Sequence, residues 1–423
     1  MRIVTDEELA VRLRKLEVAP GERPPGDDRP RVVAGGNFGT PRHLLHLVDA
    51  HVGRYRLFMI NAQPPIPDRP GVIYETPFVG PGMRHEDPAA SSRLDYLPMR
   101  LSLVPHLFER FRRPDAVLVH TTPPYGGRVS LGIEVNILVA AIEQARARGG
   151  IVVAQLNRRM PRTLGDAEID TDLVDLAVEA EEEIASPSPP PPGDVARAIG
   201  EHVAALVGDG STLQLGIGSI PNSVLAALEG RRRVGVWSEM VSDGVLALER
   251  AGCLDDERHI VASFVFGSPD LYEWADANPR LRLLRTETTN DPGRIARQPC
   301  MTSINTALQV DLFAQANASY VGGRVYSGFG GQTDFIVGSL HSPGGHAVIA
   351  LPSWHAKSRT STVLPHLESP TTSFQHSAIV TEQGAAQIFG RSQRAQARLI
   401  IEEAAHPDAR EHLRGAAAAL GLT

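Results

Sequence analysis

The sequence has few cysteines, few lysines and no long apolar run. Its 423 residues include two cysteines, Cys253 and Cys300, which give neither a disulfide framework nor the spacing of a zinc site. The only lysines are Lys15 and Lys357. No apolar stretch approaches the roughly 18 residues that span a bilayer, so we expect no membrane contact. The net charge of −7 argues against nucleic-acid binding, because that function needs a basic surface.

The N-terminal segment lacks the features of a secretory signal. Residues 1–18 mix acidic and basic side chains from the start, whereas a signal has a basic stretch followed by an apolar one. The pattern predicts instead a short surface helix that begins at Thr5 or Asp6. We therefore expect a cytoplasmic protein.

Several familiar catalytic signatures are also missing. His43 and His46 lie one helical turn apart, but no acidic residue follows at a ligand spacing, so we expect no metal site. The turn at 216–218 is not a dinucleotide fingerprint, because Pro221 replaces the third glycine. The glycine-rich run 326–335 lacks the Gly-Lys-Ser/Thr of a P-loop. No Gly-x-Ser-x-Gly elbow is present.

What the chain does have is an alternation of strand-like and helical segments. Apolar runs at 31–36, 115–124 and 150–157 have the character of strands, and the last two flank a helical pattern at 135–149. This βαβ order predicts a mostly parallel sheet covered by helices on both faces. We therefore expect an α/β fold.

A proline run at 186–193 marks the clearest domain boundary. Such a run cannot continue a helix or a central strand, and it forms a stiff, extended spacer. Asp194 is then predicted to cap a helix with four apolar residues on one face: Val195, Ile199, Val203 and Val207. Further strands are expected at 212–218, 234–240, 259–267, 318–323, 346–352 and 377–384. We expect two α/β domains, residues 1–187 and 193–423.

Two acidic residues stand where parallel sheets usually place their ligand sites. Glu239 and Asp243 follow the apolar strand candidate 234–240, and ligands bind beyond the carboxyl ends of such strands. A carboxylate there can act as a base, a ligand or a nucleophile. The structural alternative is that Glu239 caps the next helix or pairs with an arginine.

Two glycine-rich stretches offer close approach to the backbone. Gly216 and Gly218 separate a strand candidate from a helix, whose N-terminus favours anions, although tight-turn packing explains them equally well. The run 326–335 contains three glycines, and its backbone N–H groups could form an oxyanion site. An ordinary glycine-rich turn is the alternative for that run.

Taken together and in this order, these stretches resemble the acetyl-CoA hydrolase/transferase family, which includes the 4-hydroxybutyrate CoA-transferases. The resemblance spans nearly the whole chain. It begins with TPPYGGRVSLG (122–132) and is most specific in LQLGIGSIPNSVL followed by SEMVSDG. It continues through NDPGRIARQPCMTSINTALQVDL (290–312), SGFGGQTDF, ALPSWHAK and VTEQGAAQIFGRS (380–392), and ends in AAHPDAREHL. Chance agreement of so many collinear pieces is implausible.

Carried over position by position, the resemblance implies roles for individual residues. Glu239 in Ser-Glu-Met matches the family's covalent glutamate, and Gly331 matches a backbone N–H donor to the thioester oxygen. Substrate-binding roles are implied for Asn290, Glu382, Gly330, Gln332, Gly216, Gly218 and Lys357. Lys357 is near a CoA-contacting lysine, with a local spacing that differs by about one residue.

The resemblance also implies an activity. It predicts a CoA transferase that moves CoA between an acyl-CoA and a short-chain carboxylate through a glutamyl-CoA thioester. The fold would be two open, mostly parallel-sheet domains of the CoA-transferase type with the active site between them, and the protein a homodimer. No cofactor is expected beyond coenzyme A as substrate. The alternatives are an acyl-CoA hydrolase that uses the same glutamate and a catalytically silent CoA-binding homologue.

Two departures from the family pattern leave the donor and acceptor acids undetermined. Tyr125 stands where many family members have Asp after the two prolines. Phe374 and Gln375 stand where relatives often carry Arg and a polar residue. The resemblance places these positions at the entrance of the active site or in the acyl pocket. The residues to which it assigns catalytic roles are retained.

Overall fold

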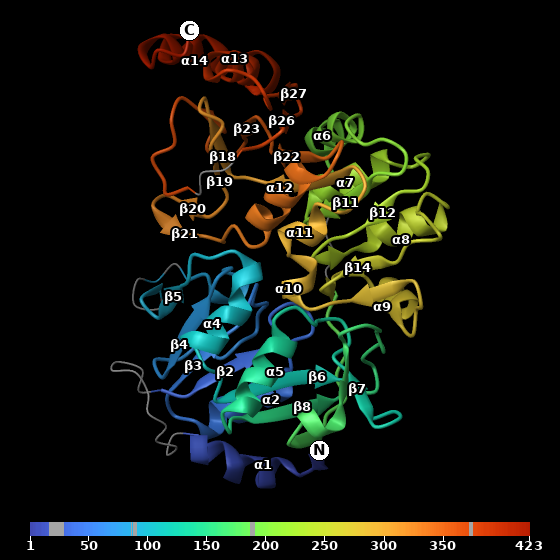
Figure 1. The fold of residues 1–423 in the computed structure, drawn as a ribbon. Helices are drawn as coiled ribbons and strands as arrows, with labels where there is room; N and C mark the ends of the chain where they lie inside the picture. The colour runs from blue at the N-terminus through green and yellow to red at the C-terminus, as the bar shows by residue number, and fades with distance from the viewer. Residues whose placement is uncertain (17–28, 86, 88–90, 187–190, 372–374) are drawn as a thin grey trace. The chain divides into compact units, whose positions relative to one another are not determined.

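The computed structural model describes residues 1–16, 29–85, 87, 91–186, 191–371 and 375–423. The chain forms two compact units, whose elements are labelled in Figure 1. The first unit contains Met1–Pro187 and Ser263–Thr288, and the second contains Ser188–Ala262 and Thr289–Thr423. Residues 187–190 of the predicted proline spacer, and Phe374, lie outside the described residues.

The first unit is built on an eight-stranded sheet with the order β1-β10-β8-β6-β2-β3-β4-β5. Adjacent strands pair in parallel throughout. Their bounds are β1 Arg2–Ile3, β2 Arg31–Ala34, β3 Tyr55–Phe58, β4 Val72–Thr76, β5 Leu94–Tyr96, β6 Ala116–Thr121, β8 Ile151–Leu156 and β10 Leu176–Glu179. Strands β2, β3 and β6 are buried at every residue, as expected for parallel strands covered on both faces. The predicted α/β class is confirmed.

The helices of this unit follow the predicted alternation. Their bounds are α1 Asp6–Leu13, α2 Arg42–His51, α4 Val104–Arg110 and α5 Leu138–Ala147. Helix α5 packs against β2, β6 and β8, and α4 packs against α5; both lie on the same side of the sheet in Figure 1. Thr5 caps α1 in a capping box with Glu8, so the helix predicted at this point is confirmed. A short antiparallel pair, β7 (Arg128–Ser130) and β9 (Glu168–Asp170), completes this part of the unit.

A buried carboxylate holds the loop that follows β2. Glu134 accepts hydrogen bonds from the N–H groups of Gly36 (3.0 Å) and Asn37 (3.1 Å). The side-chain amides of Asn37 and Asn136 also donate to it. Burial raises the pKa of Glu134, and the four donors oppose that shift by stabilising its charge. The loop at the carboxyl end of β2 is thereby fixed in place.

The segment Ser263–Thr288 belongs to the first unit, although the sequence places it within the domain predicted at 193–423. The reason is backbone pairing. Ser263 accepts from the N–H of Val135 (2.9 Å), and Leu283 donates to the carbonyl of Leu164 (2.9 Å). The segment contains β15 (Phe264–Val265), α9 (Pro269–Ala275) and β16 (Leu281–Leu283). The strand expected at 259–267 is therefore divided, since β14 ends at Ala262 in the second unit.

The second unit is built on a six-stranded sheet with the order β12-β11-β17-β22-β26-β27. All pairs are parallel except the hairpin of β26 and β27. The bounds are β11 Thr212–Leu215, β12 Gly235–Val236, β17 Met301–Thr306, β22 His346–Ala350, β26 Ala378–Thr381 and β27 Gly384–Gln387. Strand β17, in the middle of the sheet, is not among the strands expected from the sequence.

Helices surround this sheet. Their bounds are α6 Asp194–Ala204, α7 Ser219–Ala227, α8 Asp243–Arg250, α11 Pro292–Ile295, α12 Gln332–His341, α13 Gln393–Leu399 and α14 Pro407–Ala419. Helix α10 (Thr286–Thr289) falls at the point where the chain passes from the first unit to the second. Helix α12 packs on β17, β22 and α11. The predicted cap of α6 is wrong by one residue, because Gly193 occupies the N-cap and Asp194 is the first helical residue. Val195 is 45% exposed, whereas Ile199, Val203 and Val207 are buried as predicted.

Short strands complete the second unit. They are β13 Met240–Val241, β14 Ile260–Ala262, β18 Gln309–Asp311, β19 Ala316–Asn317 and β25 Val363–Leu364, with the hairpins β20–β21 (Tyr320–Val321, Arg324–Val325) and β23–β24 (Trp354–His355, Thr360–Ser361). Within the described ranges, no helix has both the length and the hydropathy of a membrane span.

Candidate active site

Glu239 lies just beyond the carboxyl end of the edge strand β12. Backbone pairing continues past β12, because the N–H of Trp237 donates to Leu213 on β11 (3.0 Å). The buried Ser238 then donates its hydroxyl to the carbonyl of Leu215 at the end of β11 (3.1 Å). These contacts fix the backbone on the N-terminal side of Glu239. The expected position of Glu239, at the end of a strand, is confirmed.

Asn290 and Gly331 are brought to the carboxyl group of Glu239. The Nδ2 of Asn290 donates to Glu239 Oε1 at 2.6 Å, and Asn290 is fully buried between α10 and α11. Gly331 is the N-cap of α12. A Cβ added to Gly331 would lie 2.6 Å from Glu239 Cδ and closer still to Oε1. Three residues from distant parts of the sequence thus meet at one carboxylate.

The carboxyl group of Glu239 has a strongly altered acidity. Burial raises its pKa from 4.5 to about 7. The negative charge of Asp334, fully buried in the first turn of α12, adds to this rise, and the hydrogen bond from Asn290 opposes it. Glu239 as a residue is half-buried, and burial of its carboxyl group is the largest cause of the raised pKa. A carboxyl group with a pKa of about 7 is partly protonated at neutral pH, and such perturbed groups are typical of catalytic sites.

The start of α12 provides a buried polar group next to Gly331. Gln332 is buried, and its Nε2 has no hydrogen-bond partner among the residues that the structure describes. Gly330 has a φ of +54°, a conformation that favours glycine. A buried donor left unpaired is costly, so this amide is available to a ligand. The residues 330–332 predicted from the sequence therefore form one continuous stretch with the cap of α12.

Glu382 forms a separate group with Ser353. The N–H of Ser353 donates to Glu382 Oε2 (2.8 Å), and the Ser353 hydroxyl makes a short hydrogen bond to Oε1. Burial works to raise the pKa of Glu382, but the hydrogen bonds from Ser353 hold it below its ordinary value. In the described part of the second unit, no hydrogen bond connects Glu382 with Glu239 or Asn290. The substrate-binding role of Glu382 stays a prediction.

Gly216 and Gly218 lie in the open turn between β11 and α7. A Cβ at either position would meet no atom within 4 Å, and Gly218 has a φ of +118°. The space next to both residues is therefore empty, in agreement with the room that we expect a ligand to need. Lys357 is exposed in the turn of the β23–β24 hairpin. Its contact with CoA also stays a prediction.

Other residues singled out in the sequence make structural contacts. Tyr125 is 70% exposed, and the guanidinium of Arg162 lies 4.8 Å from the centre of its ring. His43 pairs with Asp6 at 2.9 Å. Within the ranges that the structure describes, no three His, Cys, Asp or Glu side chains form a group that could hold a metal ion. Sequence reasoning missed Trp237, Thr289 and Ser353, which support the residues above.

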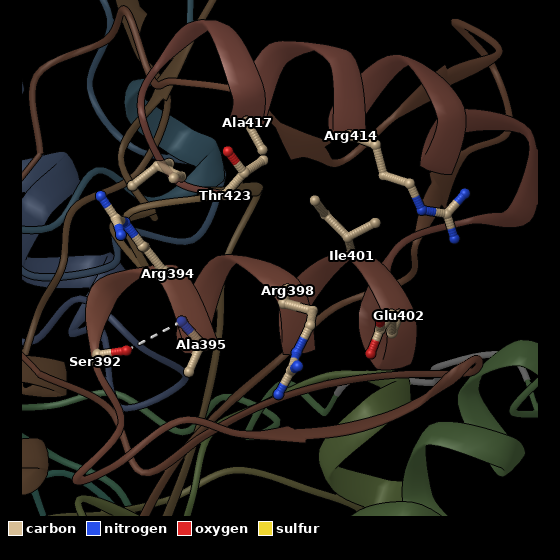
Figure 2. A pocket seen from close by; sticks show the side chains of 10 residues that line it. Ser392, Arg394, Ala395, Arg398, Ile401, Glu402, Arg414, Ala417 and Thr423 are labelled. Carbon is tan, nitrogen blue, oxygen red and sulfur yellow. Dashed lines mark hydrogen bonds between the residues drawn. The ribbon is translucent and has the colours of Figure 1, made fainter.

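A pocket between the last two long helices contains none of the predicted residues. It lies between α13 and α14 and is drawn in Figure 2. Ile401 points into the gap between the helices, while the guanidinium groups of Arg394, Arg398 and Arg414 point in different directions. Because these groups do not converge on one point, the pocket lacks the geometry of an anion site.

Comparisons with known proteins agree with this arrangement. The model of the acetyl-CoA hydrolase/transferase C-terminal domain matches residues 267–417. The chain is 39% identical over 348 residues to a 4-hydroxybutyrate coenzyme A transferase of Clostridium kluyveri, with 79% of this chain and 80% of that relative covered. It is 34% identical over 413 residues to a succinyl-CoA:acetate/propanoyl-CoA:succinate CoA transferase of Fasciola hepatica, with 92% and 85% covered.

Two further matches bear on activity and fold. An acetyl-CoA hydrolase of Saccharomyces cerevisiae is 32% identical over 260 residues, which are 57% of this chain and 48% of that enzyme. The crystal structure of RipA from Yersinia pestis superimposes with a TM-score of 0.87 at 27% identity. It covers 100% of this chain and 98% of RipA.

Proposed function

Because the chain belongs to the acetyl-CoA hydrolase/transferase family, we propose that it transfers CoA between an acyl-CoA and a short-chain carboxylate, with Glu239 as the covalent carrier. One observation carries the assignment of the carrier. The Glu239 carboxyl, with its raised pKa, is contacted at Oε1 by the Asn290 amide and by the α-carbon of Gly331. Such a carboxyl has a hydrogen-bond donor in place for its ionised form, and the glycine beside it places no side chain against it.

The reaction proceeds by two exchanges at carbonyl carbons. A carboxylate oxygen of Glu239 attacks the thioester carbonyl, the C–S bond breaks, and CoA leaves as the thiolate. The product is a mixed anhydride between the acyl group and Glu239. The thiolate then attacks Cδ of Glu239 and displaces the acyl group as a free carboxylate, which leaves a glutamyl-CoA thioester. An incoming carboxylate reverses both steps, so kinetics of the ping-pong type are expected.

The neighbours of Glu239 suit the charges that these steps create. Attack at Cδ places negative charge on Oε1, the atom to which Asn290 Nδ2 already donates. A donor that is in place before the reaction stabilises such an oxyanion without reorganisation. The N–H of Gly331 is proposed as the donor to the thioester oxygen, and the Gln332 amide as a contact to the substrate. None of these steps requires a metal or a redox group.

Hydrolysis is the second candidate activity, because acetyl-CoA hydrolases are among the relatives. Water would then take the place of the acceptor acid and attack the same anhydride or thioester. Both activities require Glu239, but they differ in their dependence on an added acid. A protein that releases CoA at the same rate with and without acetate is a hydrolase, whereas a transferase needs the acceptor. We further propose a homodimer, to be checked by the mass in solution.

Chemical trapping tests the proposed carrier directly. Borohydride reduces a thioester but not a carboxylate, so it should inactivate the protein only after an acyl-CoA has been added. Mass spectrometry should then locate the reduced residue at Glu239. A general base is never modified covalently and survives this treatment. Glu239→Ala should abolish transfer, and if that variant still transfers CoA, Glu239 is not the carrier.

A further inference from the structure

Thr289 is connected to Glu239 through the amide of Asn290. The Thr289 hydroxyl donates to Asn290 Oδ1 at 2.9 Å, and Asn290 Nδ2 donates to Glu239 Oε1 at 2.6 Å. A primary amide has its acceptor on one atom and its donors on the other. With the Thr289 hydroxyl donating to Oδ1, Nδ2 is the amide atom that faces the carboxylate.

Trp237 supports the same group through the backbone of Thr289. Its indole Nε1 donates to the backbone carbonyl of Thr289 at 2.9 Å, which anchors the residue next to Asn290. The ring packs against a buried cluster of Ile295 on α11, Met301 on β17 and Phe335 on α12. Trp237 thus contacts the elements that carry the residues around Glu239, and it lies only two residues before Glu239 itself.

We propose that Trp237 and Thr289 are positioning residues that hold the Asn290 amide in the orientation that donates to Glu239. Thr289 bonds to the Asn290 side chain, and Trp237 bonds to the backbone beside it, so both act on Glu239 through Asn290. The inference rests on the proposed function, because it describes how the proposed carrier is kept in its reactive state.

The orientation matters because the alternative is repulsive. If the amide were rotated by half a turn, Oδ1 would face the Glu239 carboxylate with no proton between the two oxygens. Asn290 is fully buried, so water cannot compensate. Asp334 is the other charged group that acts on Glu239, and it disfavours the ionised form. The Asn290 donor therefore limits the rise in the pKa of Glu239 that burial and Asp334 cause.

Thr289→Val tests the proposal, because valine keeps the shape of threonine and removes the hydroxyl. We expect kcat to fall about ten-fold, the size of effect that one lost buried hydrogen bond gives, with KM little changed because Thr289 does not touch substrate. The acidic limb of the pH profile of kcat/KM should move to higher pH. Thr289→Ser keeps a hydroxyl, so its kcat and the position of its acidic limb should match those of the parent protein.

Two further variants complete the test. Thr302→Val makes the same change at a buried threonine of the same unit, whose hydroxyl donates to the backbone of Cys300 (3.3 Å), and it should leave the limb in place. Trp237→Phe removes the indole N–H but keeps an aromatic ring, and it should move the limb in the same direction as Thr289→Val. If Thr289→Val does not fold, Trp237→Phe still decides.

The proposal is overturned if Thr289→Val and Trp237→Phe keep the parent pH profile, whatever happens to their rates or melting temperatures. A loss of rate with an unmoved limb would mean that these residues only support the fold. This outcome differs from failure of the proposed function. Borohydride trapping on the parent protein reports on Glu239 as carrier, irrespective of the Thr289 variants.

Discussion

The α-carbon of Gly331 lies directly against the carboxyl group of Glu239, so that a methyl group added there would overlap Oε1. The two residues are 92 positions apart in the sequence. Glu239 follows the edge strand β12 and Gly331 caps α12, so the contact joins the ends of two elements. The glycine at this position is required by the closeness of its neighbour rather than by its backbone angles, since its φ is −87°.

Gly331→Ala should therefore lower turnover about a hundred-fold, because Glu239 must move by a distance of the order of 1 Å, and displacements of that size have this cost. The melting temperature should change little in comparison. Gly415→Ala on α14 is the matched control, since its Cβ would meet no atom within 4 Å. That change should stabilise the helix by about 0.5–1 kcal/mol and leave turnover unaltered. Normal turnover in Gly331→Ala would rule out a tight site at Glu239.

Glu239→Asp should change the balance between transfer and hydrolysis. The shorter side chain withdraws the carboxylate by one methylene, which should cost about 10²-fold in transfer. The vacated space can admit water, so the remaining CoA release should depend less on added acetate than in the parent. The measurement is the rate of CoA release with and without acetate. A residual activity that depends on acetate as strongly as the parent would contradict this reasoning.

The rate should follow the ionisation of Glu239. Because the nucleophile is the carboxylate and its pKa is about 7, kcat/KM should rise with pH to a midpoint near that value. The hydrogen bond from Asn290 lowers this pKa, so Asn290→Ala should move the midpoint to higher pH as well as reduce the rate. The midpoint near 7 lies within the range of about pH 5 to 8. A kcat/KM profile that is flat across this range would exclude Glu239 as the titrating nucleophile.

Stability should respond to pH in the opposite sense. The folded protein holds the Glu239 proton more tightly than the unfolded chain, so this group stabilises the fold at low pH. That contribution is lost as pH rises from 4.5 through about 7. Glu239→Gln cannot ionise, so its gain over the parent in the free energy of unfolding should grow across this range to at most about 3 kcal/mol. Denaturant titrations at both ends of the range measure it, and an equal difference at both would refute the raised pKa.

Much of the fold could be predicted because parallel strands buried on both faces are continuous apolar runs. The candidates at 31–36, 115–124 and 150–157 became β2, β6 and β8. Strand β17 was missed, since its residues Thr302, Ser303 and Asn305 are polar, although Thr302 and Ser303 are fully buried. No apolar pattern marks such a strand. The Asn305 side chain bonds to Gln214 on β11 (3.3 Å), whereas the buried Ser303 hydroxyl has no hydrogen-bond partner among the described residues.

The site was predicted in part for a different reason. Glu239, Asn290 and Gly331 were identified by resemblance, and the structure brings them together. Trp237 and Thr289 have no chemical signature in a sequence, because their effect depends on which backbone carbonyl and which amide atom they reach. The burial of Glu134 is equally invisible in the sequence, since its four donors come from a loop about a hundred residues earlier and from Asn136.

The path of the chain between the two units has a consequence for its synthesis. The first unit is complete only when Ser263–Thr288 has been made, and Ser188–Ala262 of the second unit precedes that segment. About a hundred residues lie between Pro187, where the chain leaves the first unit, and Thr288, where that unit is complete. Their synthesis takes roughly 5–20 s on the ribosome. During that interval the backbone N–H of Val135 and the carbonyl of Leu164 lack their final partners. The first unit therefore remains incomplete during synthesis of the segment that contains Glu239.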